Sequence, residues 1–396
     1  MINVNKTAIR VIAVSIVLLT SVYLFTQSFY YQNHFKNANN NGIITKPSPA
    51  TTTNEKPQRI SFPDDYFHYG SFYQHENPET LRYPHNRFKA AFITFVKNDK
   101  ASLSKLRFTI RNLEDQFNKH HHYPYIIFSD QYLDDEFREL ASSLAGEATM
   151  RFEKVGSDLY GYEANTDLKR AEEARVTLNN TMFGDSEDYR FQSRFMAGTI
   201  YRHPLMQEID YSWRFEAGTE YICPMEEDPF QFMFKNKKTT SFSMALYEYK
   251  ETIPTLFQTV LDYASKHSHW IQPSGDPKTL WHFILDENNI FNGCHLWNNF
   301  QIADVSFYRG EKYQSFFNYL DTSNGIFYER WGDPVIQSLG ATLFLTKDDI
   351  HFWDNIGYRV ANYFTHCPSE KSLYSKCTCR PEENFDFNGY SCLKFY

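Results

Sequence analysis

The sequence predicts an α/β fold built on a central, mostly parallel sheet, which follows an N-terminal membrane anchor. Residues 89–96 (KAAFITFV) are a continuous apolar run of the kind that forms a buried strand. Residues 102–117 then repeat apolar side chains at helical spacing, and residues 125–128 (YIIF) are a second apolar run. A strand, a helix and a strand in this order imply parallel strands joined by a right-handed crossover.

The remaining elements continue this alternation. Pro254 stands where the first turn of an amphipathic helix is expected, a position that tolerates proline. The further predicted strands are residues 150–155, 210–215, 241–246 and 350–353, and the further predicted helices are residues 189–202, 253–266, 280–286 and 334–345. In a parallel sheet, ligands bind outside the carboxyl ends of the strands. Lys97, directly after the first strand, is therefore placed to meet a nucleotide diphosphate, with a solvated turn lysine as the alternative.

The N-terminus predicts a type II membrane anchor. Residues 8–25 are almost entirely apolar beyond Arg10 and would span about 27 Å as a helix. Lys6 and Arg10 precede the apolar run, so residues 1–7 are expected to form a cytosolic tail and everything after residue 25 to be lumenal. A cleaved signal peptide is the alternative, but no small-x-small cleavage site follows the run.

A stem is expected between the anchor and the globular part. Residues 33–86 are rich in Asn, Thr, Pro and His, a composition that buries too little apolar surface to fold alone. Residues 26–85 are thus predicted as a lumenal stem and residues 86–396 as the catalytic domain. The aromatic second half of the stem could alternatively wrap around the domain. Asn179 begins a glycosylation sequon that is usable only on the lumenal side.

Composition excludes several classes of function. The net charge of −8 argues against a nucleic-acid partner, because no basic stripe is available to neutralise phosphates. The sequence lacks a Gly-rich phosphate loop, a His-Glu-x-x-His pair and a Gly-x-Ser-x-Gly elbow, which are the signatures of kinases, zinc hydrolases and serine hydrolases. The aromatic content of 18% suits both a large core and a carbohydrate-binding surface, and does not separate them.

Four of the six cysteines crowd the C-terminus: Cys367, Cys377, Cys379 and Cys392. The Cys-x-Cys spacing differs from the Cys-x-x-Cys spacing of zinc and redox motifs. At least one disulfide within this group, formed in an oxidising lumen, is therefore expected, with zinc as the alternative. The pairing is left open.

Residues 292–333 combine charged and aromatic side chains more densely than a plain core element requires. The segment holds His295, Trp297, Arg309, Arg330 and Trp331 between two aromatic runs. It predicts a deep, partly polar pocket of the kind that binds a sugar nucleotide. The alternative is an aromatic core with satisfied polar groups.

The motifs of this segment identify a resemblance. The runs C-H-x-W-x-N-F (294–300), F-x-R (307–309) and Y-E-R-W-G-D (328–333) closely resemble the fungal KTR-type alpha-1,2-mannosyltransferases, glycosyltransferase family 15. The first predicted strand and the W-R-x-E run (213–216) match as well. The resemblance covers roughly residues 86–396. It implies a GT-A-like nucleotide-diphosphosugar transferase fold and a Golgi enzyme that moves mannose from GDP-mannose to mannose-terminated N- or O-linked glycans, with retention and with Mn²⁺.

The resemblance also implies roles for single residues. Glu216, at a strand end, would hold the metal, since hard oxygen ligands suit Mn²⁺ and Mg²⁺, and an ion pair with Arg214 is the alternative. Gln301 would lie at the reaction centre. Apart from the resemblance, His351 is another candidate ligand, with a structural strand histidine flanked by aromatic residues as the alternative. The expected donor-site residues are the phosphate-binding Lys97, Arg194 and Arg309 and the pocket-lining Tyr189, Trp297, Trp331 and Asp333.

Two departures from the family leave alternatives open. Gln301 stands where the family usually has a Glu, and an amide is a poor nucleophile. Arg359 and Val360 stand where a metal-binding His is usual, and Arg359 could neutralise the diphosphate instead. A non-catalytic, glycan-binding Golgi subunit and a mannosylphosphate transferase are therefore the alternatives to a mannosyltransferase.

Overall fold

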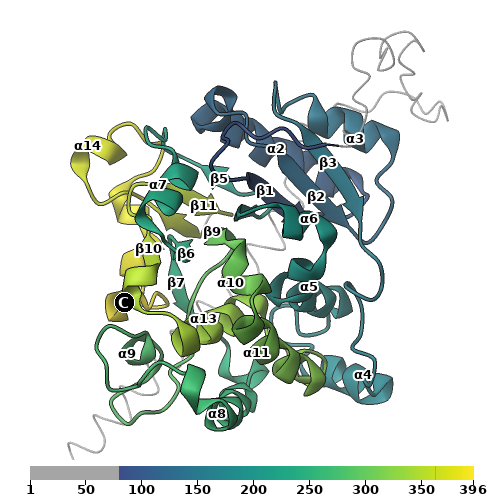
Figure 1. Ribbon diagram of the computed structural model, residues 1–396, viewed down its shortest axis with the longest axis vertical. Helices are drawn as coiled ribbons and strands as arrows, with labels where there is room; N and C mark the ends of the chain where they lie inside the picture. Colours follow the sequence, from purple (N-terminus) through teal and green to yellow (C-terminus); the bar gives the residue numbers. More distant parts are fainter. Residues whose placement is uncertain (1–79, 362) are drawn as a thin grey trace, which may run out of the picture. The chain divides into compact units, whose positions relative to one another are not determined.

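A seven-stranded sheet lies at the centre of the computed structural model, which describes residues 80–361 and 363–396 (Figure 1). Its strand order is β10-β6-β9-β4-β1-β2-β3. The strands are β1 (Ala90–Phe95), β2 (Tyr125–Ser129), β3 (Met150–Lys154), β4 (Tyr211–Phe215), β6 (Thr240–Phe242), β9 (Phe300–Asp304) and β10 (Ile350–Phe352). All neighbouring pairs are parallel except those of β9, which runs antiparallel to β4 and β6. The predicted α/β fold with a mostly parallel sheet is confirmed.

The strand directions define one edge of the sheet for ligands. Six strands end at the same edge, and β9 begins there, because Phe300 pairs with Phe215 while Asp304 pairs with Tyr211. β1 has β2 on one side and β4 on the other, so the strand order reverses between β1 and β4. Such a switch point is where open α/β sheets bind ligands. Lys97 and Glu216 follow the two strands that flank it.

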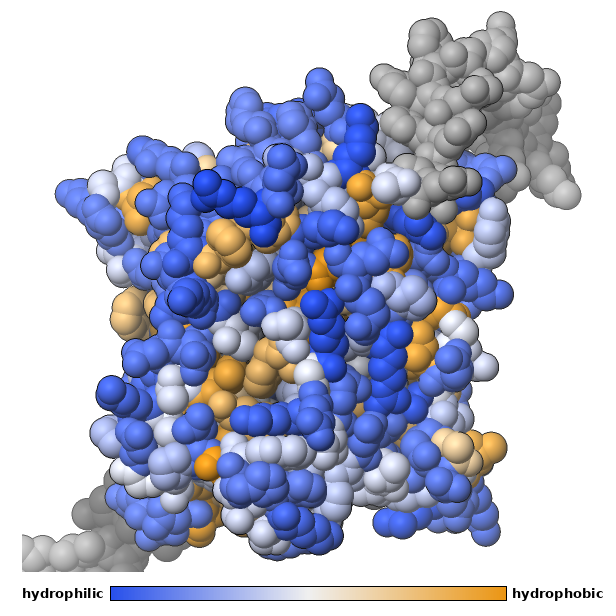
Figure 2. Space-filling view, in the orientation of Figure 1, coloured by the Kyte–Doolittle hydropathy of each residue, from blue (hydrophilic) through white to orange (hydrophobic). Residues whose placement is uncertain are grey.

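Helices cover both faces of the sheet, because the strand side chains alternate between two hydrophobic clusters. Phe92, Ile127 and Trp213 face one cluster, which is closed by α2 (Lys100–Gln116), α3 (Asp135–Ser142) and α7 (Pro229–Asn236). Ala91, Ile93 and Phe128 face the other, which is closed by α5 (Glu187–Ala197), α8 (Leu256–Lys266), α11 (Glu311–Thr322) and α13 (Asp333–Phe344). Every residue of α13 is buried, as its apolar sequence predicts. Figure 2 shows one face of the molecule, which is mostly hydrophilic with smaller hydrophobic patches.

Shorter elements complete the domain. The predicted strand 241–246 is split: β6 stays in the large sheet, whereas β7 (Ala245–Tyr247) pairs with β8 (Cys294–Leu296). A third sheet contains β5 (Glu220–Tyr221), β11 (Tyr358–Val360) and β12 (Phe364–His366). The other helices are α4 (Leu168–Thr177), α6 (Pro204–Glu208), α9 (Trp281–Ile284), α10 (Val305–Arg309), α12 (Gly325–Tyr328) and α14 (Lys371–Tyr374).

The N-terminal predictions lie outside the described residues. These are the cytosolic tail 1–7, the anchor 8–25 and the stem as far as residue 79. Within the described part of the chain, no helix combines the length and the apolar character needed to cross a membrane. The described part begins inside the predicted stem: Leu81 is buried, and the amide of Arg82 donates to Thr149 Oγ1 at 3.1 Å. Residues 80–85 thus pack on the domain.

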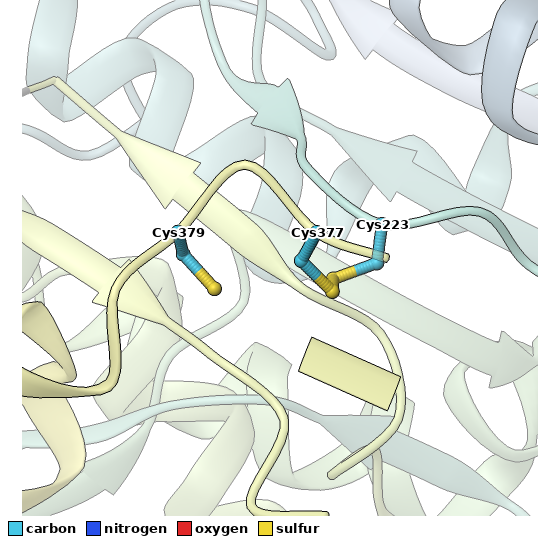
Figure 3. Close-up of side chains that lie close together, drawn as sticks. All are labelled: Cys223, Cys377 and Cys379. Atoms are coloured by element: carbon cyan, nitrogen blue, oxygen red, sulfur yellow. A yellow bond between two sulfur atoms is a disulfide. The ribbon is translucent and has the colours of Figure 1, made fainter. Parts of the chain in front are cut away.

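The cysteines form two disulfides, Cys223–Cys377 and Cys367–Cys379. The second confirms the expected bridge within the C-terminal group. Figure 3 shows the Cys223–Cys377 bond with Cys379 beside it. The three Sγ atoms lie within 4.8 Å of one another, but each is bonded to a sulfur, so none is a thiolate that could bind zinc. Cys294 and Cys392 are free and buried.

Non-reducing peptide mapping should recover the two bridges and find Cys294 and Cys392 as free thiols. Alkylation of the native protein should leave both thiols unmodified, because burial shields them, and alkylation after denaturation should label both. A bridge between Cys377 and Cys379, or four alkylated cysteines in the mature protein, would contradict this pairing.

Helix α2 carries a buried carboxyl group, Glu114, on the side that faces the sheet. Glu114 is 5% exposed, and its Oε1 accepts hydrogen bonds from Tyr125 Oη at 2.6 Å and from Asn118 Nδ2 at 2.7 Å. Burial raises its pKa from 4.5 to about 7, against the opposing effect of the two hydrogen bonds. Folding therefore favours the protonated form of Glu114.

This group should make stability pH-dependent. Because the pKa of Glu114 is higher in the folded than in the unfolded state, its contribution is fully present below pH 4.5 and is lost as the pH rises through about 7. The loss is on the order of 3 kcal/mol. Glu114→Gln keeps the acceptor oxygen without the charge, so its free energy of unfolding should exceed that of the parent at pH 8 and match it near pH 4.5. Parallel pH profiles by urea denaturation would contradict the assignment.

Candidate functional site

Two ion pairs meet at the carboxyl edge of β4. Arg214 is in β4, and its Nη1 donates to Oδ2 of Asp333, the first residue of α13. Asn298 Nδ2 donates to the same oxygen at 2.8 Å. Glu216 lies just beyond, half-buried, and burial raises its pKa, with Asp333 adding to the rise and Arg214 opposing it. A cation bound next to Glu216 would stabilise the ionised form of its carboxyl group.

The second pair is formed by the Y-E-R-W-G-D segment. Arg330 Nη2 donates to Glu248 Oε1 at 2.9 Å, and the guanidinium lies 5.1 Å from the ring centre of Tyr189. A side chain at position 332 would meet Tyr189 Oη at 3.0 Å, so Gly332 permits this close approach. The charges of Arg330, Glu248 and Asp333 all act on the pKa of Tyr189, which burial raises to about 12. Both ion pairs therefore belong to one site.

Buried polar atoms at this site have no partner among the described residues. They are Arg214 Nε, Arg330 Nε and Asn298 Oδ1. A buried donor or acceptor left without a hydrogen bond is rare in folded proteins and is costly. Two cationic donors and one acceptor around a single place are suited to a polar, anionic ligand.

Lys97 lies at the neighbouring strand end. Its Nζ is 2.8 Å from Asp130 Oδ2 and 2.5 Å from Asp188 Oδ1, and it lies 4.8 Å from the ring centre of Tyr160. A pocket of about 390 Å³ adjoins these partners, lined by Asp130, Val155, Ser157, Tyr160, Glu187, Asp188 and Phe191. Lys97 would have to exchange a carboxylate partner for a phosphate to bind a nucleotide.

Sequence reasoning missed several members of the site. Glu248 follows β7, and nothing in its local sequence marks it; Arg330 was visible in the motif but was given no role. Lys105 of α2 lowers the pKa of Glu216. Its side chain packs beside Gly218, where a side-chain Cβ would lie 3.3 Å from Lys105 Cγ. Gln192 of α5 hydrogen bonds to Glu216. Its place three residues after Tyr189 on a helix was the available signal.

Arg194 and Arg309 do not lie at this site. Arg194 is buried and forms a two-pronged ion pair with Asp321, Nε–Oδ1 2.8 Å and Nη2–Oδ2 2.9 Å, and its Nη1 donates to backbone carbonyls. Arg309 Nη1 donates to the carbonyls of Met206, Gln207 and Ile209, at the amino end of β4. The phosphate-binding roles predicted for these two arginines are wrong, because protein partners occupy both guanidinium groups, and Arg309 lies at the opposite edge of the sheet from the ligand site.

The two tryptophans differ. Trp331 is 1% exposed, its Nε1–H donates to Glu329 Oε2 at 2.5 Å, and it fills the space beside Gly325, so it is a core residue and the predicted pocket-lining role is wrong. Trp297 is half-buried, and its ring centre lies 5.1 Å from that of Phe364. Since Trp297 precedes β9, it lies near the ligand edge of the sheet.

His351 is not a partner of Glu216. β10 is three strands from β4 in the sheet, about 14 Å at a strand spacing of about 4.8 Å. The ring of His351 packs against Phe232 and Trp353, which belong to the cluster on the face of Trp213. A metal site that contains both Glu216 and His351 is therefore excluded by the geometry.

Gln301 of β9 pairs with Arg214 of β4. This pair lies one residue further from the ligand edge than the pair of Phe300 and Phe215. Its Nε2 is within 3.0 Å of Gln337 Oε1, 3.1 Å of Tyr308 Oη and 3.3 Å of Thr240 Oγ1. The cavity beside it measures about 10 Å³, which accommodates one water and no sugar. Arg359 also has a protein partner: its Nη1 is 2.7 Å from Oε2 of Glu220.

The chain is similar to known mannosyltransferases in sequence and in structure. The family model described as glycolipid 2-alpha-mannosyltransferase matches residues 24–396. Glycolipid 2-alpha-mannosyltransferase 2 of Candida albicans is 38% identical over 78% of this chain and 67% of that protein. The O-glycoside alpha-1,2-mannosyltransferase omh1 of Schizosaccharomyces pombe is 36% identical over 84% of this chain and 83% of that protein.

Two solved structures share the fold. The mannosyltransferase Ktr4p of Saccharomyces cerevisiae, in complex with GDP, has a TM-score of 0.72 at 28% identity and covers 80% of this chain and 84% of its own. Core-mannan synthase A of Aspergillus fumigatus, in an Mn/GDP form, has a TM-score of 0.69 at 26% identity and covers 83% and 86%. The chain therefore belongs to the glycolipid 2-alpha-mannosyltransferase family, the fungal alpha-1,2-mannosyltransferases that its motifs resemble.

Proposed function

We propose that this chain transfers mannose from GDP-mannose to a hydroxyl of a mannose-terminated glycan, forming an alpha-1,2 linkage with retention. The observation that carries this proposal is the buried cluster of Arg214, Glu216, Asp333, Arg330 and Glu248 at the switch point, with donors that lack protein partners. The GDP in the related Ktr4p structure supports a guanine nucleotide as its ligand.

The charges of the site favour a bound cation. Glu216, Asp333 and Glu248 bring three carboxylates to the cluster, and the charge of Asp333 raises the pKa of Glu216, so a cation bound beside Glu216 would relieve this repulsion and would also offset the charge of a diphosphate. Glu216 is half-buried at a strand end and offers the hard oxygen that Mn²⁺ or Mg²⁺ binds together with nucleotide phosphates. When bound, the ion would neutralise negative charge that develops on the leaving diphosphate. The Mn/GDP form of core-mannan synthase A supports Mn²⁺.

The protein side chains would position the reactants. Asp333 is fixed by Arg214 and Asn298, and Arg330 is fixed by Glu248 over Tyr189, so both are oriented before substrate arrives. Trp297 offers a half-buried ring for the face of a sugar. Lys97, which follows the end of β1, would neutralise part of the negative charge of the diphosphate.

Gln301 bears on how retention is achieved. An amide is too weak a nucleophile for a glycosyl-enzyme intermediate, and the small cavity beside Gln301 admits no sugar. Attack on the same face as the departing diphosphate, with a diphosphate oxygen accepting the hydroxyl proton, needs no carboxylate at this position. Retention by this route is part of the proposal.

The proposal includes a location. A GT-A-like domain would lie in the Golgi lumen behind a type II anchor at residues 8–25, with Lys6 and Arg10 on the cytosolic side. Two disulfides are suited to an oxidising lumen. Protease added to sealed vesicles should spare everything beyond residue 26, and digestion of the globular domain would overturn this topology.

Turnover of the purified full chain tests the activity. The chain is incubated with GDP-mannose, Mn²⁺ and alpha-linked mannose acceptors, and the products are analysed by mass and by NMR of the new linkage. Addition of one hexose with an alpha-1,2 linkage is expected. An added phosphate in the product mass would identify a mannosylphosphate transferase, and GDP binding without any product would favour the non-catalytic alternative.

A further inference from the structure

A second pocket opens beside β10, away from the cluster at the switch point. It measures about 410 Å³ and lies between α7, β10 and α14, which Figure 1 shows together at one side of the molecule. Aromatic side chains and carboxylates dominate its lining. The lining residues used below are Glu226, Phe232, His351, Trp353, Asp354 and Leu373.

Three aromatic rings pack against one another in this pocket. The ring centres of Phe232 and His351 are 4.3 Å apart, those of Phe232 and Trp353 are 5.1 Å apart, and those of His351 and Trp353 are 4.3 Å apart. Burial, with the Lys238 charge adding to it, lowers the pKa of His351 to about 4. The imidazole is therefore neutral near pH 7 and can both donate and accept a hydrogen bond.

Trp353 carries an unused donor. Its side chain is 2% exposed, and its indole Nε1–H has no acceptor among the described residues. The indole N–H can only donate, so an acceptor atom from a water or a ligand is needed to satisfy it. A buried N–H without an acceptor is rare in folded proteins.

The carboxylates of the pocket are largely occupied by protein partners. Glu226 pairs with Lys376, Asp354 accepts hydrogen bonds from Ser369 at 2.8 Å (Oγ) and 3.2 Å (amide), and Glu370 accepts one from Ser372. The acidic lining repels an anion. A cation would have to compete with the existing partners of these carboxylates.

The pocket lies on the same edge of the sheet as Glu216. β10 runs in the same direction as β4, and Trp353 follows its last residue, Phe352. Residues 354–357 lead from Trp353 to Tyr358, whose pKa is raised by burial and, to a smaller degree, by Glu216. A chain molecule that begins at the Glu216 site could thus reach the pocket along one edge, across about 14 Å of sheet.

We propose that this pocket binds a neutral hexose unit of the acceptor glycan, remote from the hydroxyl that receives mannose. The C–H face of the sugar would lie on the half-buried rings of Phe232 and His351, which pack against Trp353, and a sugar hydroxyl would hydrogen bond to the neutral imidazole of His351. This inference rests on the proposed function, since it assigns a second subsite to the same acceptor. It makes the enzyme selective for oligosaccharides over a single mannose.

Leu373→Trp tests the proposal, because a larger side chain on α14 fills the pocket without touching the Glu216 site. The matched control is Leu261→Trp on α8, where the leucine is 38% exposed. For each full-length variant, kcat/KM is measured for a mannotetraose and for methyl alpha-mannoside. Leu373→Trp should lower the ratio of the two values at least fivefold, and Leu261→Trp should leave the ratio unchanged. An unchanged ratio in Leu373→Trp would overturn the proposal.

Direct binding separates this inference from the proposed function. Saturation-transfer NMR with mannotetraose, in the absence of GDP-mannose, reports the pocket even if the chain transfers no mannose. The parent and Leu261→Trp should show the transfer signal, and Leu373→Trp should lose most of it. Equal signals in Leu373→Trp and the parent would show that the pocket is not a carbohydrate subsite.

Discussion

Replacement of Glu216 by Gln should lower mannose transfer by at least about a hundredfold while the domain stays folded. Glu216 is the half-buried carboxylate at the end of β4, next to the switch point of the sheet. Gln keeps the size of the side chain and can retain a hydrogen bond to Gln192, but it removes the negative charge that would hold a divalent ion. Loss of a charge-based contribution of about 3 kcal/mol in the transition state corresponds to about a hundredfold in rate.

The pH profile of the parent provides a second readout. Burial raises the pKa of Glu216, so the ionised form accumulates only as the pH rises through that value, and activity should rise with it on the acidic side. Mn²⁺ should move this limb to lower pH, because a bound cation favours the carboxylate. Glu216→Gln should lack the limb.

Glu220→Gln is the control for this experiment. Glu220 is a nearby half-buried glutamate on β5 whose carboxylate pairs with Arg359 at 2.7 Å. It should keep the metal dependence of GDP affinity, measured by calorimetry with and without Mn²⁺, whereas Glu216→Gln should lose it. Unchanged affinity in a folded Glu216→Gln variant would return Glu216 to a simple ion pair with Arg214.

The fold was predictable where the pattern is local. About forty residues contain the whole pattern that predicts β1, α2 and β2. It consists of the apolar runs at residues 89–96 and 125–128 and the helical periodicity between them. The break between β6 and β7 was missed, because residues 241–246 read as one strand and its division between two sheets depends on β8 and β9, far along the chain. The antiparallel position of β9 between β4 and β6 was not predicted either, because it depends on pairing between strands that are far apart in the sequence.

The site was predictable where a residue follows a strand. Lys97 and Glu216 were placed at the carboxyl edge because strand ends in a parallel sheet share that edge. Arg194 was assigned to phosphate because a sequence shows a cation but not its partner, and that partner, Asp321, is 127 residues away. His351 was misassigned for a related reason, since strand order and face are set by pairing and not by the residues themselves.

Arg194→Met should destabilise the domain by about 3–5 kcal/mol. The substitution leaves Asp321, which is 4% exposed, without the arginine that makes both of its charged hydrogen bonds. It also removes the donors that Arg194 gives to the carbonyls of Asp158 and Gly161, which tie α5 to the segment after β3. The free energy of unfolding is measured by urea denaturation at pH 7.

A double variant and a neighbouring arginine isolate the cause. Arg194→Met combined with Asp321→Leu should recover much of the loss, because a buried ion pair can be replaced by apolar groups of similar volume at little cost. Arg202→Met, which removes an exposed arginine that hydrogen bonds to Gln314 and Asn318, should cost less than about 1 kcal/mol. GDP affinity, measured where each variant is folded, should equal that of the parent. A stable Arg194→Met protein with weakened GDP binding would restore the phosphate-binding role, because only a contact with the nucleotide could then explain the change.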